Sequence, residues 1–152
     1  MYICGISVSM EIRELRAGNL INRKRTGVVT VGIGTFVHMD NYKDDYYSGI
    51  ELSEEWLERF GFRIWGHNTS KMAALKISDV LEFEYDLVKK ELSICYDDHE
   101  IEGQWSCIPM FHIKYVHQLQ NLYYVLTNGE ELVLYSQEMT KGLRKESRDQ
   151  GI

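Results

Sequence analysis

The densest run of side chains that could do chemistry is Asp97-Asp98-His99-Glu100. Carboxylates and an imidazole on one turn could hold a hard divalent cation, or act as acid and base in a small metal-dependent hydrolase. Consecutive side chains point in different directions, however, and aspartate is common in turns because it hydrogen-bonds its own backbone. The sequence therefore predicts no catalytic residue, no metal ligand and no cofactor. A small metal-dependent hydrolase stays an alternative function.

The thiols and imidazoles add no catalytic pattern. Cys4, Cys95 and Cys107 are an odd number of cysteines and are too widely spaced for a zinc knuckle. We expect reduced thiols of a cytoplasmic protein, with Cys95 and Cys107 as small core residues. His112 and His117 are five residues apart, so one helix would not present both to a metal as it presents an i,i+4 pair. A non-enzymatic protein is favoured over an enzyme.

The composition is that of one globular domain. The chain has 152 residues, of which 44% are hydrophobic and 12% aromatic, with a single proline. No apolar run approaches the roughly 18 residues that span a bilayer, so we expect no membrane association. We predict a single domain over residues 1–135, in which 1–9 are an optional extension. Residues 136–152 are polar and predict a flexible tail.

The net charge of −6 is unevenly distributed. Acidic side chains gather in residues 40–59 and 79–102, and an acidic surface repels phosphate over about a Debye length. Direct nucleic-acid binding is therefore disfavoured, although Arg23-Lys24-Arg25 could serve it. A protein that mimics DNA is a related alternative, and its acidic face would comprise Glu82, Glu84, Asp86, Asp97 and Asp98.

Local signals predict an α+β fold. A short helix over 54–60 has Ser53 as N-cap and Gly61 at its end. Leu52 and Leu57 stand at the positions of a hydrophobic staple, which fixes the entry of the chain into the helix. This segment is the clearest local signal in the sequence.

Alternating apolar residues predict an antiparallel sheet. Strands are expected at 81–86, 92–96 and 104–110, with a hairpin turn at 87–90. The same alternation over 28–39 predicts one sharply bent strand or a hairpin. An SH3-like small barrel is one form that the N-terminal half could take, by analogy of fold alone.

A longer helix over 112–126 is predicted to pack on the sheet by an apolar arc. The opposite side has one formal charge, Lys114, where an ordinary solvent-facing helix would be rich in Glu and Lys. Uncharged polar surface is typical of interface cores, so this side is covered either by the protein itself or by a partner. The candidate partner-binding residues are Lys114, His117, Gln118, Gln120, Asn121 and Tyr124, and the loop 42–47 is a further candidate.

Three segments carry a resemblance to a known family. Residues 113–132 (IKYVHQLQNLYYVLTNGEEL) resemble the ending of a family of small proteins from Bacteroides-type gut bacteria, their prophages and mobile elements. Residues 15–21 (LRAGNLI) and 50–62 (IELSEEWLERFGF) resemble earlier parts of the same family, in the same order. Asn128 is an insertion relative to the family pattern. The family has no assigned activity, so the resemblance implies a genomic setting.

Together these observations predict an accessory protein of a phage or mobile element that acts by interaction. It would bind a protein partner or a second copy of itself through the charge-poor side of the helix over 112–126.

Overall fold

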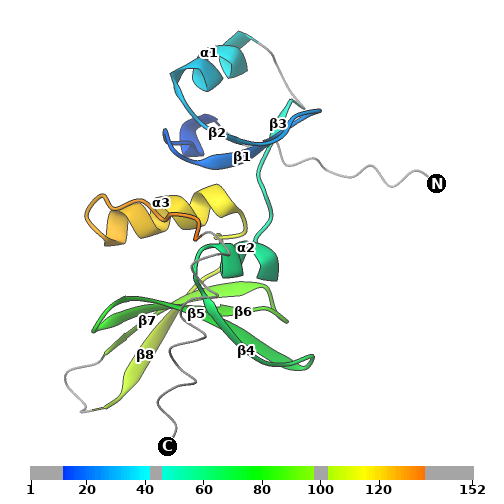
Figure 1. The fold of residues 1–152 in the computed structure, drawn as a ribbon. Coiled ribbons are helices and arrows are strands. Elements are labelled where there is room, and N and C mark those ends of the chain that lie inside the picture. Colours follow the sequence, from blue (N-terminus) through cyan, green and yellow to red (C-terminus); the bar gives the residue numbers. More distant parts are fainter. Residues whose placement is uncertain (1–11, 42–45, 98–102, 136–152) are drawn as a thin grey trace, which may run out of the picture. The chain divides into compact units, whose positions relative to one another are not determined.

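The computed structural model describes residues 12–41, 46–97 and 103–135 (Figure 1). It has the α+β fold with antiparallel sheets that the sequence predicts. The chain divides into two compact units, which are described separately. Unit 1 comprises residues 1–51 and 115–131, and unit 2 comprises residues 52–114 and 132–152. The extension 1–9 and the tail 136–152 lie outside the described residues, and the single domain over 1–135 stays a prediction.

Unit 1 places a three-stranded sheet between two helices (Figure 1). The strand order is β2-β1-β3 and both pairings are antiparallel. Ile21, Val31 and Met39 form a buried core, against which Leu15, Val29, Phe36 and Tyr47 pack. On the other face of the sheet, α3 contacts β1, as expected for the C-terminal helix. The elements are η1 (Ile12–Glu14), β1 (Leu20–Arg23), β2 (Gly27–Thr30), α1 (Ile33–Asn41), β3 (Tyr47–Ser48) and α3 (Val116–Leu126).

Unit 2 is a five-stranded antiparallel meander with one short helix (Figure 1). Its strands follow one another in chain order, so β4 and β8 are the two edges. Pro109 lies in the edge strand β8, where its missing N–H is tolerated. The elements are α2 (Glu54–Arg59), β4 (Arg63–His67), β5 (Ser70–Ser78), β6 (Leu81–Asp86), β7 (Glu91–Asp97) and β8 (Trp105–Met110).

The strongest local signals of the sequence are confirmed in unit 2. Ser53 is the N-cap of α2, and its hydroxyl accepts a hydrogen bond from the Trp56 N–H at 3.4 Å. Gly61 follows the helix with a φ of +85°, a conformation that glycine adopts at little cost. Both staple residues, Leu52 and Leu57, are buried. The three predicted strands of the sheet are β6, β7 and β8.

The prediction of a strand over 28–39 is wrong beyond Thr30. The alternation holds in β2, but Gly32 interrupts it and the chain continues as α1. Phe36 and Met39 then share a helical face that packs on the core, which is the i,i+3 spacing of a helix. Thr35 supports the helix start, because its hydroxyl accepts a hydrogen bond from the Gly32 N–H at 3.2 Å. The described residues thus include an α-helix, α1, that the sequence did not predict.

The N-terminal strands form an open sheet within the described residues, and the likeness to an SH3-like barrel stays a prediction. The helix predicted over 112–126 begins four residues later, at Val116, with Tyr115 as N-cap. Asn128 and Gly129 follow it with positive φ angles, as its predicted end requires.

Candidate functional site

The charge-poor side of α3 is covered within unit 1 by the segment that leads into β1. Gln120 is buried, and its Oε1 accepts a hydrogen bond from the Leu20 N–H at 2.8 Å. Its Nε2 lies 3.5 Å from the Gly18 carbonyl oxygen. The side chain therefore satisfies backbone groups that would otherwise be buried without partners, which is costly.

Asn121 makes a second link to the same segment. Its Oδ1 accepts a hydrogen bond from Asn19 Nδ2 at 2.9 Å, and its Nδ2 donates to the Glu14 carbonyl oxygen at 2.7 Å. Asn19 is fully buried, and its own Oδ1 accepts from the Arg16 N–H at 2.7 Å. We call Asn19, Gln120 and Asn121 the amide cluster. Neutral amides suit this place because each both donates and accepts without the cost of burying a charge.

Three other predicted partner-binding residues also have contacts within their own unit. Gln118 Oε1 accepts a hydrogen bond from the Tyr115 N–H at 3.1 Å, which caps the first turn of α3. Tyr124 lies beneath the guanidinium of Arg16, whose Cζ is 3.9 Å from the ring centroid. Lys114 is exposed, and its carbonyl oxygen accepts from the Leu52 N–H at 2.9 Å in unit 2.

His117 is buried against Tyr115, with ring centroids 5.8 Å apart and nearly parallel planes. Its Nε2 lies 3.5 Å from Glu14 Oε2, and neither ring nitrogen forms a hydrogen bond with the described residues. Burial lowers the pKa of His117, and the Glu14 carboxylate offsets part of that shift. The Tyr115 ring packs closely against Gly49. A Cβ at this position would lie 2.7 Å from the ring, so the packing leaves no room for a side chain there.

These contacts give a structural reason for the unusual composition of α3. Its uncharged polar side chains hold the segment 14–20 to the helix, a task that Glu or Lys would perform poorly when buried. The partner-binding role of the six residues stays a prediction.

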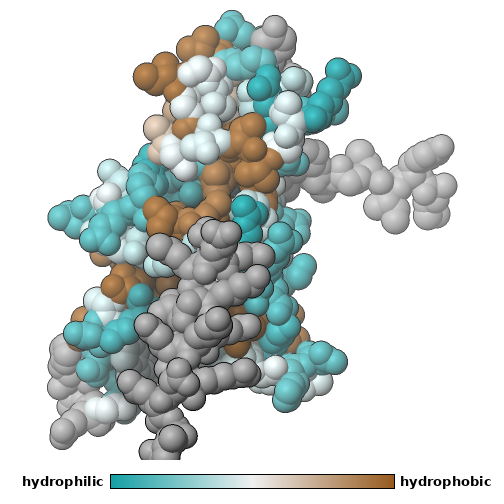
Figure 2. Space-filling model, in the orientation of Figure 1, coloured by the Kyte–Doolittle hydropathy of each residue, from teal (hydrophilic) through white to brown (hydrophobic). Residues whose placement is uncertain are grey.

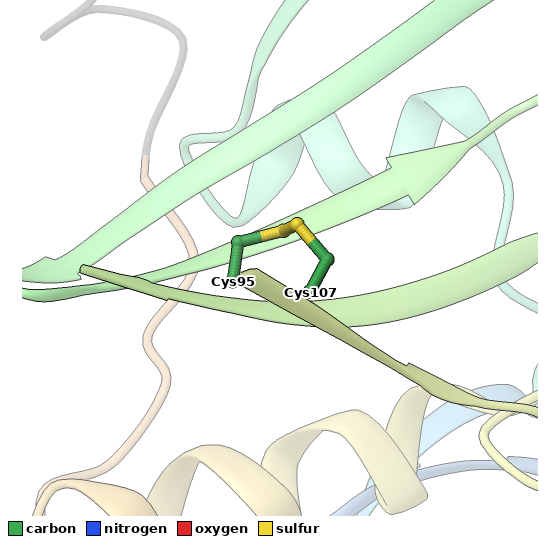
Figure 3. The surroundings of a disulfide bond; sticks show 2 residues. All are labelled: Cys95 and Cys107. Atoms are coloured by element: carbon green, nitrogen blue, oxygen red, sulfur yellow. A yellow bond between two sulfur atoms is a disulfide. The ribbon is translucent and has the colours of Figure 1, made fainter. Parts of the chain in front are cut away.

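The expectation of reduced thiols is wrong for Cys95 and Cys107, and the expectation of a core residue is wrong for Cys107. Cys95 on β7 and Cys107 on β8 form a disulfide (Figure 3). The register of the two strands places these residues directly opposite each other, with Cα atoms 4.0 Å apart. Cys95 is buried as predicted, whereas Cys107 is exposed on the edge strand. The sequence signal that could have identified the pair is that each cysteine lies in a predicted strand, and that the two strands, 92–96 and 104–110, follow one another along the chain.

Glu84 on β6 lies beside this disulfide. One oxygen of its carboxylate and the sulfur atoms of Cys95 and Cys107 all lie within 4.8 Å of one another. Burial raises the pKa of Glu84, and the neighbouring Glu82 carboxylate adds to the rise. We call Glu84, Cys95 and Cys107 the thiol–carboxylate cluster. No local pattern in the sequence combines these three residues, because they lie on three different strands.

The remaining carboxylates of the predicted acidic face have varied surroundings. Asp86 Oδ1 accepts hydrogen bonds from the Val88 and Lys89 N–H groups, both at 2.9 Å, and thereby shapes the turn after β6. Asp97 ends β7, and the rest of the run 97–100 lies outside the described residues. The alternative that this run holds a divalent cation stays a hypothesis.

Apolar surface is exposed on α1 (Figure 2). Ile33 is 82% exposed and Val37 is 58% exposed. The two residues are four apart, so their side chains are neighbours on one face of the helix. Phe36 and Met39 on the opposite side of α1 contact the core, so the exposed pair is a separate surface. We call Ile33 and Val37 the α1 stripe.

The tip of the β1–β2 hairpin carries the basic triplet. Lys24 and Arg25 are exposed there, and Arg25 has a φ of +74°. The guanidinium of Arg23 lies over the Tyr46 ring, with Cζ 5.3 Å from the centroid. Tyr46 in turn contacts the rings of Tyr47 and His38.

The chain matches no family model, no curated protein sequence and no solved structure. Among the described residues, no helix is long and apolar enough to cross a membrane.

Proposed function

We propose that this protein is a non-enzymatic protein-binding module, and that its partner docks on the α1 stripe. The observation that carries the proposal is the exposure of Ile33 and Val37 together on one helical face. The genomic setting that we propose, a phage or mobile element, follows from the sequence resemblance alone.

The energetics favour a docked partner over bulk water at this face. Burial of a branched apolar side chain contributes about 1.5–3 kcal/mol, which exposed Ile33 and Val37 forgo. Anchors spaced i,i+4 are the pattern by which an amphipathic helix enters an apolar groove of another protein. The polar residues Asp40 and Asn41 lie at the end of the helix, as in a polar rim around an apolar centre.

The test compares two substitutions that add the same charge at valines of similar exposure. Val37→Lys places an ammonium on the α1 stripe, whereas Val88→Lys alters a residue that is 51% exposed in the turn after β6. We expect Val37→Lys to weaken partner binding at least about tenfold, and Val88→Lys to leave it unchanged. Partners captured by the full chain would be identified by mass spectrometry, purified and then measured by calorimetry.

Equal binding by the two variants would contradict docking on α1. The partner could also be a second copy of this chain, and sedimentation of the purified chain measures its oligomeric state. A dimer that Val37→Lys dissociates would identify the second copy as the partner. We expect Val37→Lys to keep α1 folded, because lysine is a better helix former than valine. Far-UV circular dichroism of both variants checks that the fold is retained.

A second candidate function, nucleic-acid binding, is favoured by the contact of Arg23 with Tyr46. Surfaces that bind single-stranded nucleic acid combine cationic side chains, which contact the phosphates, with aromatic rings, on which the bases stack. The test is anisotropy of a labelled single-stranded oligonucleotide over a range of salt concentrations. Arg25→Ala should lower the salt slope by about 0.7 if this residue contacts one phosphate. An unchanged slope would exclude that contact.

A further inference from the structure

We propose that reduction of the Cys95–Cys107 disulfide converts the thiol–carboxylate cluster into a binding site for a thiophilic divalent cation such as Zn²⁺. The ligands are the two Sγ atoms and the carboxylate of Glu84, which converge from three neighbouring strands. The proposal is independent of partner docking on α1.

The sheet register explains why three ligands meet here. Glu84 pairs with Ser93, and Cys95 lies two residues further along β7, so its side chain points to the same face. Cys107 lies opposite Cys95 on β8 and shares that face. Residues held by strand pairing need no loop rearrangement to present their ligand atoms together.

The distances suit a tetrahedral ion. Zinc binds sulfur at about 2.3 Å and carboxylate oxygen at about 2.0–2.2 Å, so its ligand atoms lie roughly 3.3–3.8 Å apart. The three ligand atoms already lie within 4.8 Å of one another. After the S–S bond is broken, the two sulfur atoms must move apart, and the Glu84 carboxylate must move about 1 Å closer to them to reach tetrahedral ligand spacing. Side-chain rotation alone can supply such shifts.

Electrostatics also favour a cation at this place. A carboxylate that is half-buried beside a second carboxylate is destabilised as the anion, which is why the pKa of Glu84 is raised. A divalent ion reverses that effect because it stabilises the anion and both thiolates. Three protein ligands leave a fourth position for water, which is the arrangement of an open site.

Reduction must precede metal binding because a disulfide offers no thiolate. A dithiol reductant supplies the two electrons that break the S–S bond and itself becomes a disulfide, leaving Cys95 and Cys107 as thiols. Binding of the divalent ion then releases both thiol protons to solvent. The exposure of Cys107 lets the reductant reach this sulfur.

The experiment uses the full chain with Cys4→Ser, which removes the third cysteine of the sequence. The protein is reduced with a dithiol, freed of it under inert gas, and titrated with Co²⁺ as a spectroscopic probe and then with Zn²⁺. We expect thiolate-to-cobalt charge-transfer absorption that saturates at one equivalent and disappears when Zn²⁺ is added. The oxidised chain should show no such band.

Two glutamine variants test the role of the carboxylate. Glu84→Gln removes a ligand and should weaken Co²⁺ binding at least about tenfold, since even groups that only support ligands are worth that much. Glu91→Gln is the matched control, because Glu91 lies on the same face of β7 beyond Ser93 and outside the cluster. Its affinity should equal that of the parent chain.

Three results would overturn the proposal: no charge-transfer band in the reduced chain, equal affinities of the two glutamine variants, or equal binding by the oxidised chain. Thiol titration provides a further check. If both cysteines remain titratable after exposure to oxygen, the redox control is refuted. Should reduction unfold the sheet, Co²⁺ binding would no longer depend on Glu84, and that outcome also counts against the site.

Discussion

Both units have an apolar core, but the buried polar side chains among the described residues, Asn19, His117 and Gln120, all belong to unit 1. In unit 1, α3 is joined to the segment before β1 by neutral amides, and Gln120 reaches a backbone group 100 residues earlier in the sequence. In unit 2, the sheet rests on large apolar side chains such as Phe83 and Leu92, both fully buried. Amide contacts specify one arrangement by geometry, whereas apolar contacts contribute most of the free energy. The difference predicts distinct responses to substitution, which can be read separately because all three tryptophans, Trp56, Trp65 and Trp105, belong to unit 2.

The largest effect is expected in the apolar core of unit 2. Phe83→Ala removes a fully buried ring and should lower the free energy of unfolding by about 3–5 kcal/mol. Ile108→Ala on the same sheet is the control, since Ile108 is largely exposed and should change stability by less than about 0.5 kcal/mol. Urea unfolding followed by tryptophan fluorescence measures both. Similar midpoints for the two variants would show that the sheet does not depend on this core.

A smaller effect is expected in the amide cluster. Gln120→Ala leaves the Leu20 N–H without its acceptor and should cost about 1–3 kcal/mol. Hydrogen exchange is the sharpest measurement, because the Leu20 amide should lose protection before its neighbours do. Val125→Ala is the control on the same helix, where the exposed side chain can be removed at little cost. Unchanged protection of Leu20 in Gln120→Ala would contradict a structural role for the amide.

Acid should lower the stability of unit 1 by protonating its buried residue His117. The folded chain holds the pKa of this imidazole below its ordinary value of 6.5, so protonation favours the unfolded state. The stability that the neutral ring contributes is full above about pH 6.5 and is lost as the pH falls through that value toward the lower pKa of the folded chain. His117→Gln should remove this component of the pH dependence, as measured by unfolding at a series of pH values. A variant with the parent's acid sensitivity would assign the effect to other groups.

The smallest effect concerns the ion pair of Arg16 with Glu131. Both side chains are partly exposed, so Arg16→Ala should cost only about 0.2–1 kcal/mol, including the contact with Tyr124. Lys76→Ala breaks the more exposed pair with Asp79 and should have no measurable effect. Added salt should reduce the difference between Arg16→Ala and the parent chain. A cost above about 2 kcal/mol would mean that Arg16 contributes to the core of unit 1.

Local signals account for what the sequence could predict. Ser53, Gly61 and the staple leucines lie within one short segment, and their roles depend only on neighbours along the chain. The strands β6 and β7 were likewise evident from strict alternation around a tight turn. The helix α1 was missed because Val31, Ile33 and Val37 extend the alternation of β2 past Gly32, and only the packing of Phe36 and Met39 decides for a helix.

Long-range pairing accounts for what the sequence did not predict. The uncharged side of α3 was recognised as covered, but nothing in the local pattern identifies Asn19 as the partner of Asn121, since 102 residues separate them. The disulfide depends on the register of β7 and β8, and a shift by one residue would have placed Cys95 and Cys107 on opposite faces. Glu84 joins them only because β6 is the next strand of the meander.

Pro109 has a consequence for how the sheet ends. The short Cα distance between Cys95 and Cys107 is typical of a pair whose backbone groups point away from each other, and the pair Ser93–Pro109, two residues along, has the same orientation. The nitrogen of Pro109 therefore points toward the outer border of β8, where it offers no hydrogen to an incoming chain. A strand added at this border would lack one of the hydrogen bonds that pair it with β8. Growth into fibres is thereby discouraged at this border without help from any charged side chain.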